Sequence, residues 1–252
     1  MILGITAALF WATGGQAVAG ALPMESGRTQ IITKVELQSA SKGFSPEGRL
    51  VGIGGRKDET ASIHVEYGLS ERLTLQARGG LTRGRDPFVD YEGRGPVEVG
   101  LRYAFVQRPQ TIAAFYLGAG EAGAGRNAGY AVPGEGGLDL EARLLLGRSK
   151  ATRFGSFFSD VQIAYLRRAG LANETRVDAT LGFRPTRNWL LLAQTYAGEA
   201  QSSPVKSRWL KAEVSVVRHF GPWSLQAGWR ETLDGRETAA DRGAVVGIWR
   251  HF

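Results

Sequence analysis

In the last eleven residues of the 252-residue chain, 242–252, every second side chain from Ala244 onward is apolar with one exception, and the stretch ends on an aromatic ring. Successive side chains of a β-strand point to opposite faces, so this pattern predicts an amphipathic strand. A single arginine interrupts the apolar face, which consists of Ala244, Val246, Ile248, Arg250 and Phe252. Any fold that contains such a strand must cover this face with a protein core or with lipid.

The same two-residue period recurs along most of the chain and predicts about twelve strands. Each is near the ~9–11 residues with which a tilted strand crosses a bilayer. Very short links alternate with longer ones, although the link at 148–154 has seven residues and the link at 169–172 breaks the alternation. The longer links are expected at 41–58, 83–94, 122–134, 200–205 and 233–241. The expected strands are 29–40, 59–69, 72–82, 95–106, 110–121, 135–147, 155–168, 173–184, 188–199, 206–220, 222–232 and 242–252.

The composition agrees with many strands joined by turns. The chain has 35 glycines and 10% aromatic residues. After the N-terminal segment, no apolar run approaches the ~20 residues that a transmembrane helix needs, so any membrane span must be a strand. There are no cysteines, and therefore no disulfide holds the fold.

A water-soluble β-sandwich also shows one-sided alternation, and the positions of the aromatic residues argue against it. These residues lie beside the expected short turns or at the C-terminus, as in the interfacial girdle of a membrane barrel. They are Tyr67, Phe105, Phe183, Trp189, Phe220, Trp223 and Phe252.

With these features, the chain resembles the outer-membrane β-barrel proteins of Gram-negative bacteria, either porin-like or transporter-like. The resemblance implies an all-β fold in the outer membrane: a single antiparallel transmembrane β-barrel of about 12 strands, with short periplasmic turns and longer extracellular loops. It also implies outer-membrane lipids, lipopolysaccharide and the barrel-assembly machinery as partners. That machinery recognises a terminal aromatic residue, which makes Phe252 the expected assembly signal.

The N-terminus indicates export to the same compartment. Residues 1–11 are apolar and uncharged, and Ala17-Val18-Ala19 has the small-x-small pattern of a signal-peptide cleavage site. We therefore expect residues 1–19 to be a signal peptide and residues 20–252 to form the barrel.

The net charge of +7 does not indicate a nucleic-acid partner, because basic residues are scattered among acidic ones. The Gly-rich stretch 118–123 matches a dinucleotide fingerprint, but no helix or βαβ unit is expected after it. No histidine or acidic cluster has the spacing of metal ligands. We expect no cofactor and no metal.

Function must then reside on the inward face and in the loops. Charges of both signs alternate with the apolar residues and nearly cancel, which predicts a narrow passive channel or transporter for small polar or amphiphilic solutes with little ion selectivity. The sequence does not identify the solute. Glu98 and Arg102, on one face of one strand, are expected to pair and narrow the pore. The pore-lining candidates are His64, Glu66, Arg78, Glu98, Arg102, Asp139, Glu141, Arg143, Asp160, Arg176, Asp178, Lys211, Glu213 and Arg230.

Two alternatives remain at this point. Some twelve-stranded outer-membrane barrels are lipid hydrolases or deacylases, and Ser62 with His64 is the corresponding pair here. Both residues have inward parity, away from acyl chains, so no catalytic residue is assigned. The other alternative is a barrel that its own lumen charges plug, with a structural or interaction role.

Basic residues are frequent in the expected outer loops, where they could bind the phosphates of lipopolysaccharide. They are Lys42, Arg49, Arg56, Lys57, Arg83, Arg85, Arg94, Arg126, Arg236 and Arg242.

Overall fold

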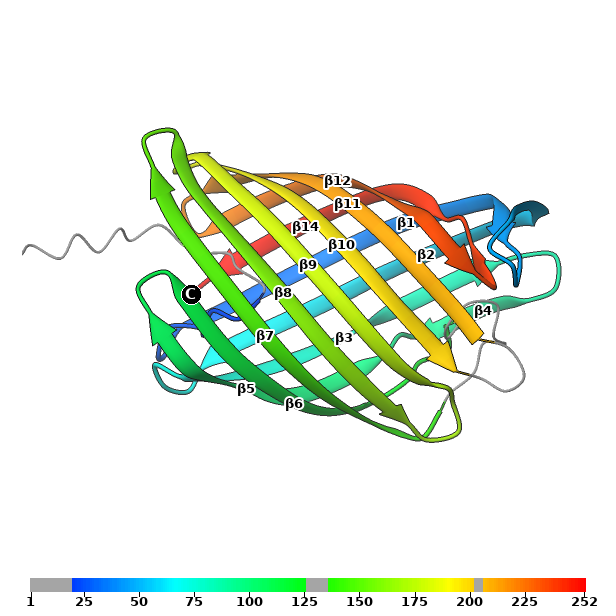
Figure 1. The fold of residues 1–252 in the computed structure, drawn as a ribbon, viewed down its shortest axis with the longest axis horizontal. Coiled ribbons are helices and arrows are strands. Elements are labelled where there is room, and N and C mark those ends of the chain that lie inside the picture. Colours follow the sequence, from blue (N-terminus) through cyan, green and yellow to red (C-terminus); the bar gives the residue numbers. More distant parts are fainter. Residues whose placement is uncertain (1–19, 126–135, 202–205) are drawn as a thin grey trace, which may run out of the picture.

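The computed structural model describes residues 20–125, 136–201 and 206–252, and these residues form antiparallel strands (Figure 1). None of them belongs to a helix that is long and apolar enough to span a membrane. The strands are β1 (Thr29–Phe44), β2 (Leu50–Gly68), β3 (Leu73–Arg85), β4 (Asp90–Arg94), β5 (Val97–Arg108), β6 (Thr111–Glu121), β7 (Leu138–Thr152), β8 (Gly155–Arg168), β9 (Asn173–Thr186), β10 (Trp189–Gln201), β11 (Lys206–Phe220), β12 (Trp223–Arg236), β13 (Thr238–Ala239) and β14 (Arg242–His251).

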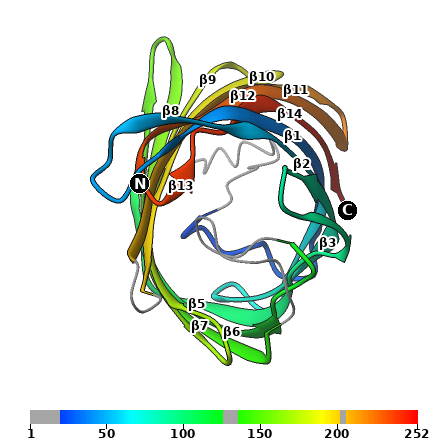
Figure 2. The ribbon, with the colours of Figure 1, turned by 90° about the vertical axis from the view of Figure 1, so that its right-hand side faces the viewer.

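The sheet closes on itself, because β1 pairs with β2 on one side and with β14 on the other. Strands β4 and β5 both pair with β3, one after the other, and together act as one strand of the wall. The break between them falls at Pro96, which has no N–H to donate, while the Gly95 N–H still donates to the Gly80 carbonyl at 2.8 Å. Figure 2 shows the closed ring end-on. The expected antiparallel barrel of twelve wall strands is confirmed.

The two ends of the barrel differ in how the chain reverses. One end, here called the turn end, carries both ends of the described chain and the short reversals at 69–72, 109–110, 153–154, 187–188 and 221–222. The opposite end is called the loop end. Short turns of outer-membrane barrels face the periplasm, so the turn end is the periplasmic one.

The strands extend further at the loop end than the sequence predicted. The expected loop 41–58 is mostly strand, with its turn at 45–49, and the expected loop 83–94 has its turn at 86–89. At the turn end, the expected link 148–154 is a two-residue turn, 153–154. Backbone pairing continues where the outward side chains turn polar, as at Arg83, because a strand that leaves the lipid needs no apolar face.

The outward faces are apolar, as alternation predicted. Of the seven girdle aromatics, all except Phe183 are more than a third exposed. Phe183 stacks on Phe157 with ring centroids 4.4 Å apart. The exposed apolar side chains form a band around the wall and include Ile63, Val99, Leu101, Leu140, Leu144, Leu181, Leu225, Val246 and Ile248.

The interior has little apolar core. Its two small apolar clusters include residues near the turn end, on opposite parts of the wall. One contains Leu190, Val217 and Trp249, and the other contains Tyr116 and Ala21. Polar and charged side chains fill much of the remaining inner wall, so this polar interior is where a functional site must be sought.

Candidate functional site in the barrel lumen

Some side chains form ion pairs with strands that are not their neighbours in the wall, and these side chains must point into the barrel. Arg78 on β3 reaches Glu141 on β7 at 3.3 Å, although β5 and β6 lie between these strands in the wall. Such a contact can form only across the interior. All fourteen predicted pore-lining residues have this inward parity. The structure brings most of them into two ion-pair networks, described here as the Glu141 network and the Glu213 network.

The Glu141 network runs along the inner wall from β3 to β9. Its central carboxylate contacts Arg78 at 3.3 Å, Arg176 at 3.9 Å and also Arg143. Arg78 in turn pairs with Glu98 at 2.6 Å. Toward the loop end, the network continues through Glu174 and Arg168 to Asp139.

The Glu213 network covers the opposite part of the wall. Arg230 donates to Glu213 at 2.6 Å and to Glu36 on β1 at 2.5 Å, and the Lys34 ammonium lies 3.7 Å from Glu213. The Gln226 amide also donates to Glu213, at 3.1 Å. Every polar group of this carboxylate therefore has a partner, as burial demands.

Arg102 does not pair with Glu98, which corrects the expectation from the sequence. It donates to both oxygens of Glu66 on β2, at 3.0 and 2.9 Å, and is almost fully buried. Glu98 and Arg102 are four positions apart on one strand, so their backbones are about 13 Å apart. Residues directly opposite each other on neighbouring strands are only about 5 Å apart. Arg78 holds that opposite position and takes Glu98.

The charges balance in number but differ in exposure. The side chains of Arg78, Arg176 and Lys211 are 36%, 29% and 29% exposed. The carboxylates of Glu141 and Glu213 are 0% exposed. Glu36, at 20%, and the half-buried Asp178 are the more accessible acids. The accessible charged groups of the lumen are therefore mainly guanidinium and ammonium groups, and most of the carboxylates paired with them are less exposed.

A segment before β1 lies inside the barrel at the turn end. The sequence did not predict this position. The Ala21 N–H donates to Asp160 at 2.8 Å, the Leu22 carbonyl accepts from Arg102 at 2.7 Å, and the Met24 N–H donates to the Thr74 hydroxyl at 2.9 Å. Figure 2 shows this segment crossing the ring. The only sequence signal was an apolar stretch, residues 21–24, between the expected cleavage site and the first strand. The segment, residues 20–26, is called the lumen segment below.

The histidines are bonded to wall residues. His64 Nε2 lies 3.2 Å from the Glu66 carboxylate, and His219 Nδ1 lies 2.8 Å from the Ser224 hydroxyl. Ser224 is completely buried, so no lipid can reach its hydroxyl. In the described ranges, no group of three or more His, Cys, Asp or Glu side chains could hold a metal ion.

Comparison with solved structures supports the architecture. An outer membrane channel from Pseudomonas putida F1 has a TM-score of 0.70 and 12% identity, with 93% of this chain and 99% of that chain covered. LpxR from Salmonella typhimurium has a TM-score of 0.55 and 8% identity, covering 88% and 99%. The NanC porin has a TM-score of 0.52 and 10% identity, covering 85% and 98%. The sequence matches no protein-family model and no curated protein.

The closed wall, the apolar outer face and the polar lumen define a transmembrane β-barrel. This chain has the fold of the outer-membrane β-barrel proteins of Gram-negative bacteria, as the resemblance implied. The likeness covers the architecture and does not single out one subfamily. Because one barrel fold hosts unrelated functions, the chain's own lumen residues must carry the functional argument.

Proposed function

We propose that this barrel is a narrow passive channel for small polar or amphiphilic solutes, with a preference for anions. The observation that carries the proposal is the exposure of Arg78, Arg176 and Lys211 above carboxylates that are buried. The preference for anions departs from the sequence-based expectation of little selectivity. That expectation counted charges, but a passing ion interacts most strongly with the charges nearest to it.

A paired guanidinium still attracts anions in a narrow passage. The interaction between two charges falls with distance, so an anion gains more from the cation that it touches than it loses to the carboxylate behind it. Rings of Arg and Lys are a known basis of anion selectivity in pores. The remaining partial exposure of these side chains supports a lumen that admits solvent.

The lumen segment supports a small size limit. Arg102 and Asp160 hold its backbone across the turn end, and a buried salt bridge to Glu66 fixes Arg102 in place. A solute must pass beside this segment or displace it. The channel is therefore expected to conduct small ions in small steps and to exclude polymers.

The test is ion selectivity in planar bilayers, with the purified full barrel under a potassium chloride gradient. Discrete conductance steps with a reversal potential that favours chloride are expected. Replacing both inner cations, Arg78→Gln with Arg176→Gln, should lower the chloride preference. Arg83→Gln, at the loop end, removes an exposed cation paired with Glu59 and serves as the control. Persistent silence of the wild type would favour a plugged barrel, and a cation preference would contradict the proposal.

A further inference from the structure

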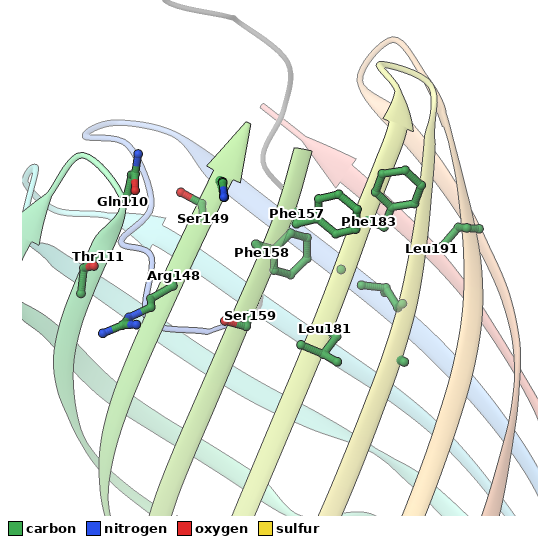
Figure 3. Close-up of a pocket in the computed structure, with 14 residues that line it drawn as sticks. Gln110, Thr111, Arg148, Ser149, Phe157, Phe158, Ser159, Leu181, Phe183 and Leu191 are labelled. Atoms are coloured by element: carbon green, nitrogen blue, oxygen red, sulfur yellow. The ribbon is translucent and has the colours of Figure 1, made fainter. Parts of the chain in front are cut away.

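The lipid-facing wall carries a groove of about 700 Å³ near the turn end, over β6 to β10. Phe157, Leu181, Phe183 and Leu191 form its apolar sides, as Figure 3 shows. Its lining also includes the small side chains of Ser159 and Ala193, with outward parity, and Gly182. The outer surface is recessed at this point because small residues interrupt a band of large apolar ones.

The groove is closed toward the lumen. Gly182 has no side chain, and the ring of Phe158 packs against it from inside: a Cβ at Gly182 would lie 2.1 Å from this ring. Phe158 also packs on the inner apolar cluster that contains Leu192. The groove is consequently a dent in the outer surface with a sealed floor, and an occupant must come from the membrane.

Two cations border this groove. Arg148 and Lys150 have outward parity on β7, and both are exposed. Neither side chain forms an ion pair or hydrogen bond with any other described residue. They lie within five residues of the turn at 153–154, where the strand ends. Their position corresponds to the headgroup level of the periplasmic leaflet, which consists of phospholipid.

We propose that the groove is a binding site for one phospholipid of the periplasmic leaflet, with a preference for an anionic headgroup. An acyl chain would lie against the four apolar sides, and the phosphate would lie between Arg148 and Lys150. The volume is within the usual 300–1,000 Å³ of small-molecule sites. Cations without protein partners complement the phosphate, because charge-assisted hydrogen bonds to phosphate are strong. This site is independent of conduction through the lumen.

Native mass spectrometry of the full barrel, in micelles with equal phosphatidylglycerol and phosphatidylcholine, tests the proposal. The wild type should retain phosphatidylglycerol about tenfold better, the equivalent of one charge-assisted hydrogen bond. The double variant R148Q/K150Q should lose this preference. The double variant K42Q/R242Q removes two exposed cations at the loop end and should keep it.

A third variant tests the apolar part of the site. Ala193→Phe fills the groove floor without a change of charge and should reduce retention of both lipids. Migration of unboiled samples on a gel verifies that each variant is folded. No headgroup preference in the wild type, or an unchanged preference in R148Q/K150Q, would overturn the proposal. With lipopolysaccharide added to the same micelles, its retention through Arg148 and Lys150 in place of phosphatidylglycerol would also overturn the proposal.

Discussion

The two ends of the barrel handle positive charge in different ways. At the loop end, many arginines are neutralised by carboxylates of the protein: Arg83 by Glu59, Arg85 by Asp90, Arg94 by Glu121 and Arg208 by Asp234. At the turn end, no such ion pair forms among the described residues for Arg28, Arg72, Arg108, Arg148, Lys150, Arg153, Arg187, Arg218 and Arg250. The turn end therefore presents its cations to the membrane and the periplasm.

Several of these turn-end cations lie on aromatic rings instead. The Arg250 guanidinium is 4.4 Å from the centre of the Trp223 ring and 5.0 Å from that of Phe252. Arg218 lies 4.6 Å above Trp189. These contacts leave the charge unneutralised, so phosphate remains its natural partner. The net charge, here +7, therefore says less about binding partners than the positions of the compensating carboxylates do.

The largest expected effect comes from a matched series of Leu→Arg substitutions along the outer wall. Leu144→Arg, near the midplane, should lower the free energy of unfolding by roughly 2–4 kcal/mol, and Leu225→Arg at the turn end by less than about 1 kcal/mol. Leu138→Arg provides the loop-end member. Urea titration in vesicles, read by gel migration, measures all three. Equal costs would refute the assigned membrane position.

A second test compares how lumen arginines at the two ends of the barrel affect conductance. Arg102→Ala removes the donor to the Leu22 carbonyl and leaves Glu66 without its main cation, so the lumen segment should loosen and conductance should rise. Loss of the Glu98–Arg102 pair expected from the sequence would also widen the pore, but in the structure Arg102 contacts Leu22 and Glu66 instead. Arg168→Ala, at the loop end, should change conductance less. Single-channel recording decides, and an unchanged conductance for Arg102→Ala would count against obstruction by the segment.

A smaller difference is expected between single surface cations. Arg250→Gln removes two ring contacts and should cost roughly 0.5–1 kcal/mol of unfolding free energy. Arg83→Gln breaks an exposed ion pair and should cost less than about 0.5 kcal/mol. Unfolding midpoints at low and high salt measure both. If Arg83→Gln lowered the free energy of unfolding more than Arg250→Gln, the ion pairs at the loop end would contribute more to stability than the ring contacts at the turn end.

The smallest effect concerns lipopolysaccharide at the loop end. Of the ten basic loop residues predicted to bind it, Arg49, Arg56, Arg83, Arg85 and Arg94 contact carboxylates. Arg126 lies outside the described residues, so Lys42, Lys57, Arg236 and Arg242 are the remaining candidates. Lipopolysaccharide should raise refolding yield modestly at low salt, and K42Q/R242Q should reduce this gain. A gain that survives the double variant would assign the effect to other residues.

The two-residue alternation of apolar and polar side chains was sufficient to predict the barrel architecture. It predicted about twelve strands, and it placed all fourteen pore-lining candidates on one face of the wall, because parity is a local property of the chain. Their role in lining a conducting pore stays a prediction. Pairing is not local: Arg102 reaches Glu66 across β3, which depends on the register of three strands. Nor could alternation reveal the lumen segment, since residues 20–26 have no strand of their own. The expected signal peptide lies outside the described residues and stays a prediction.

The pairing of β1 with β14 also determines the order in which the barrel can form. Gln30 and His251 meet across this seam although 221 positions separate them in the sequence. Closing so long a loop costs entropy before any contact repays it, and folds dominated by such distant pairing form slowly. Until the last strand arrives, two edges expose backbone groups that lipid cannot satisfy. Arg230, which reaches from β12 over β14 to Glu36 on β1, can secure the seam only once it has closed. We therefore expect completion of the wall to be the slow step in biogenesis, and an open barrel to need its edges shielded until then.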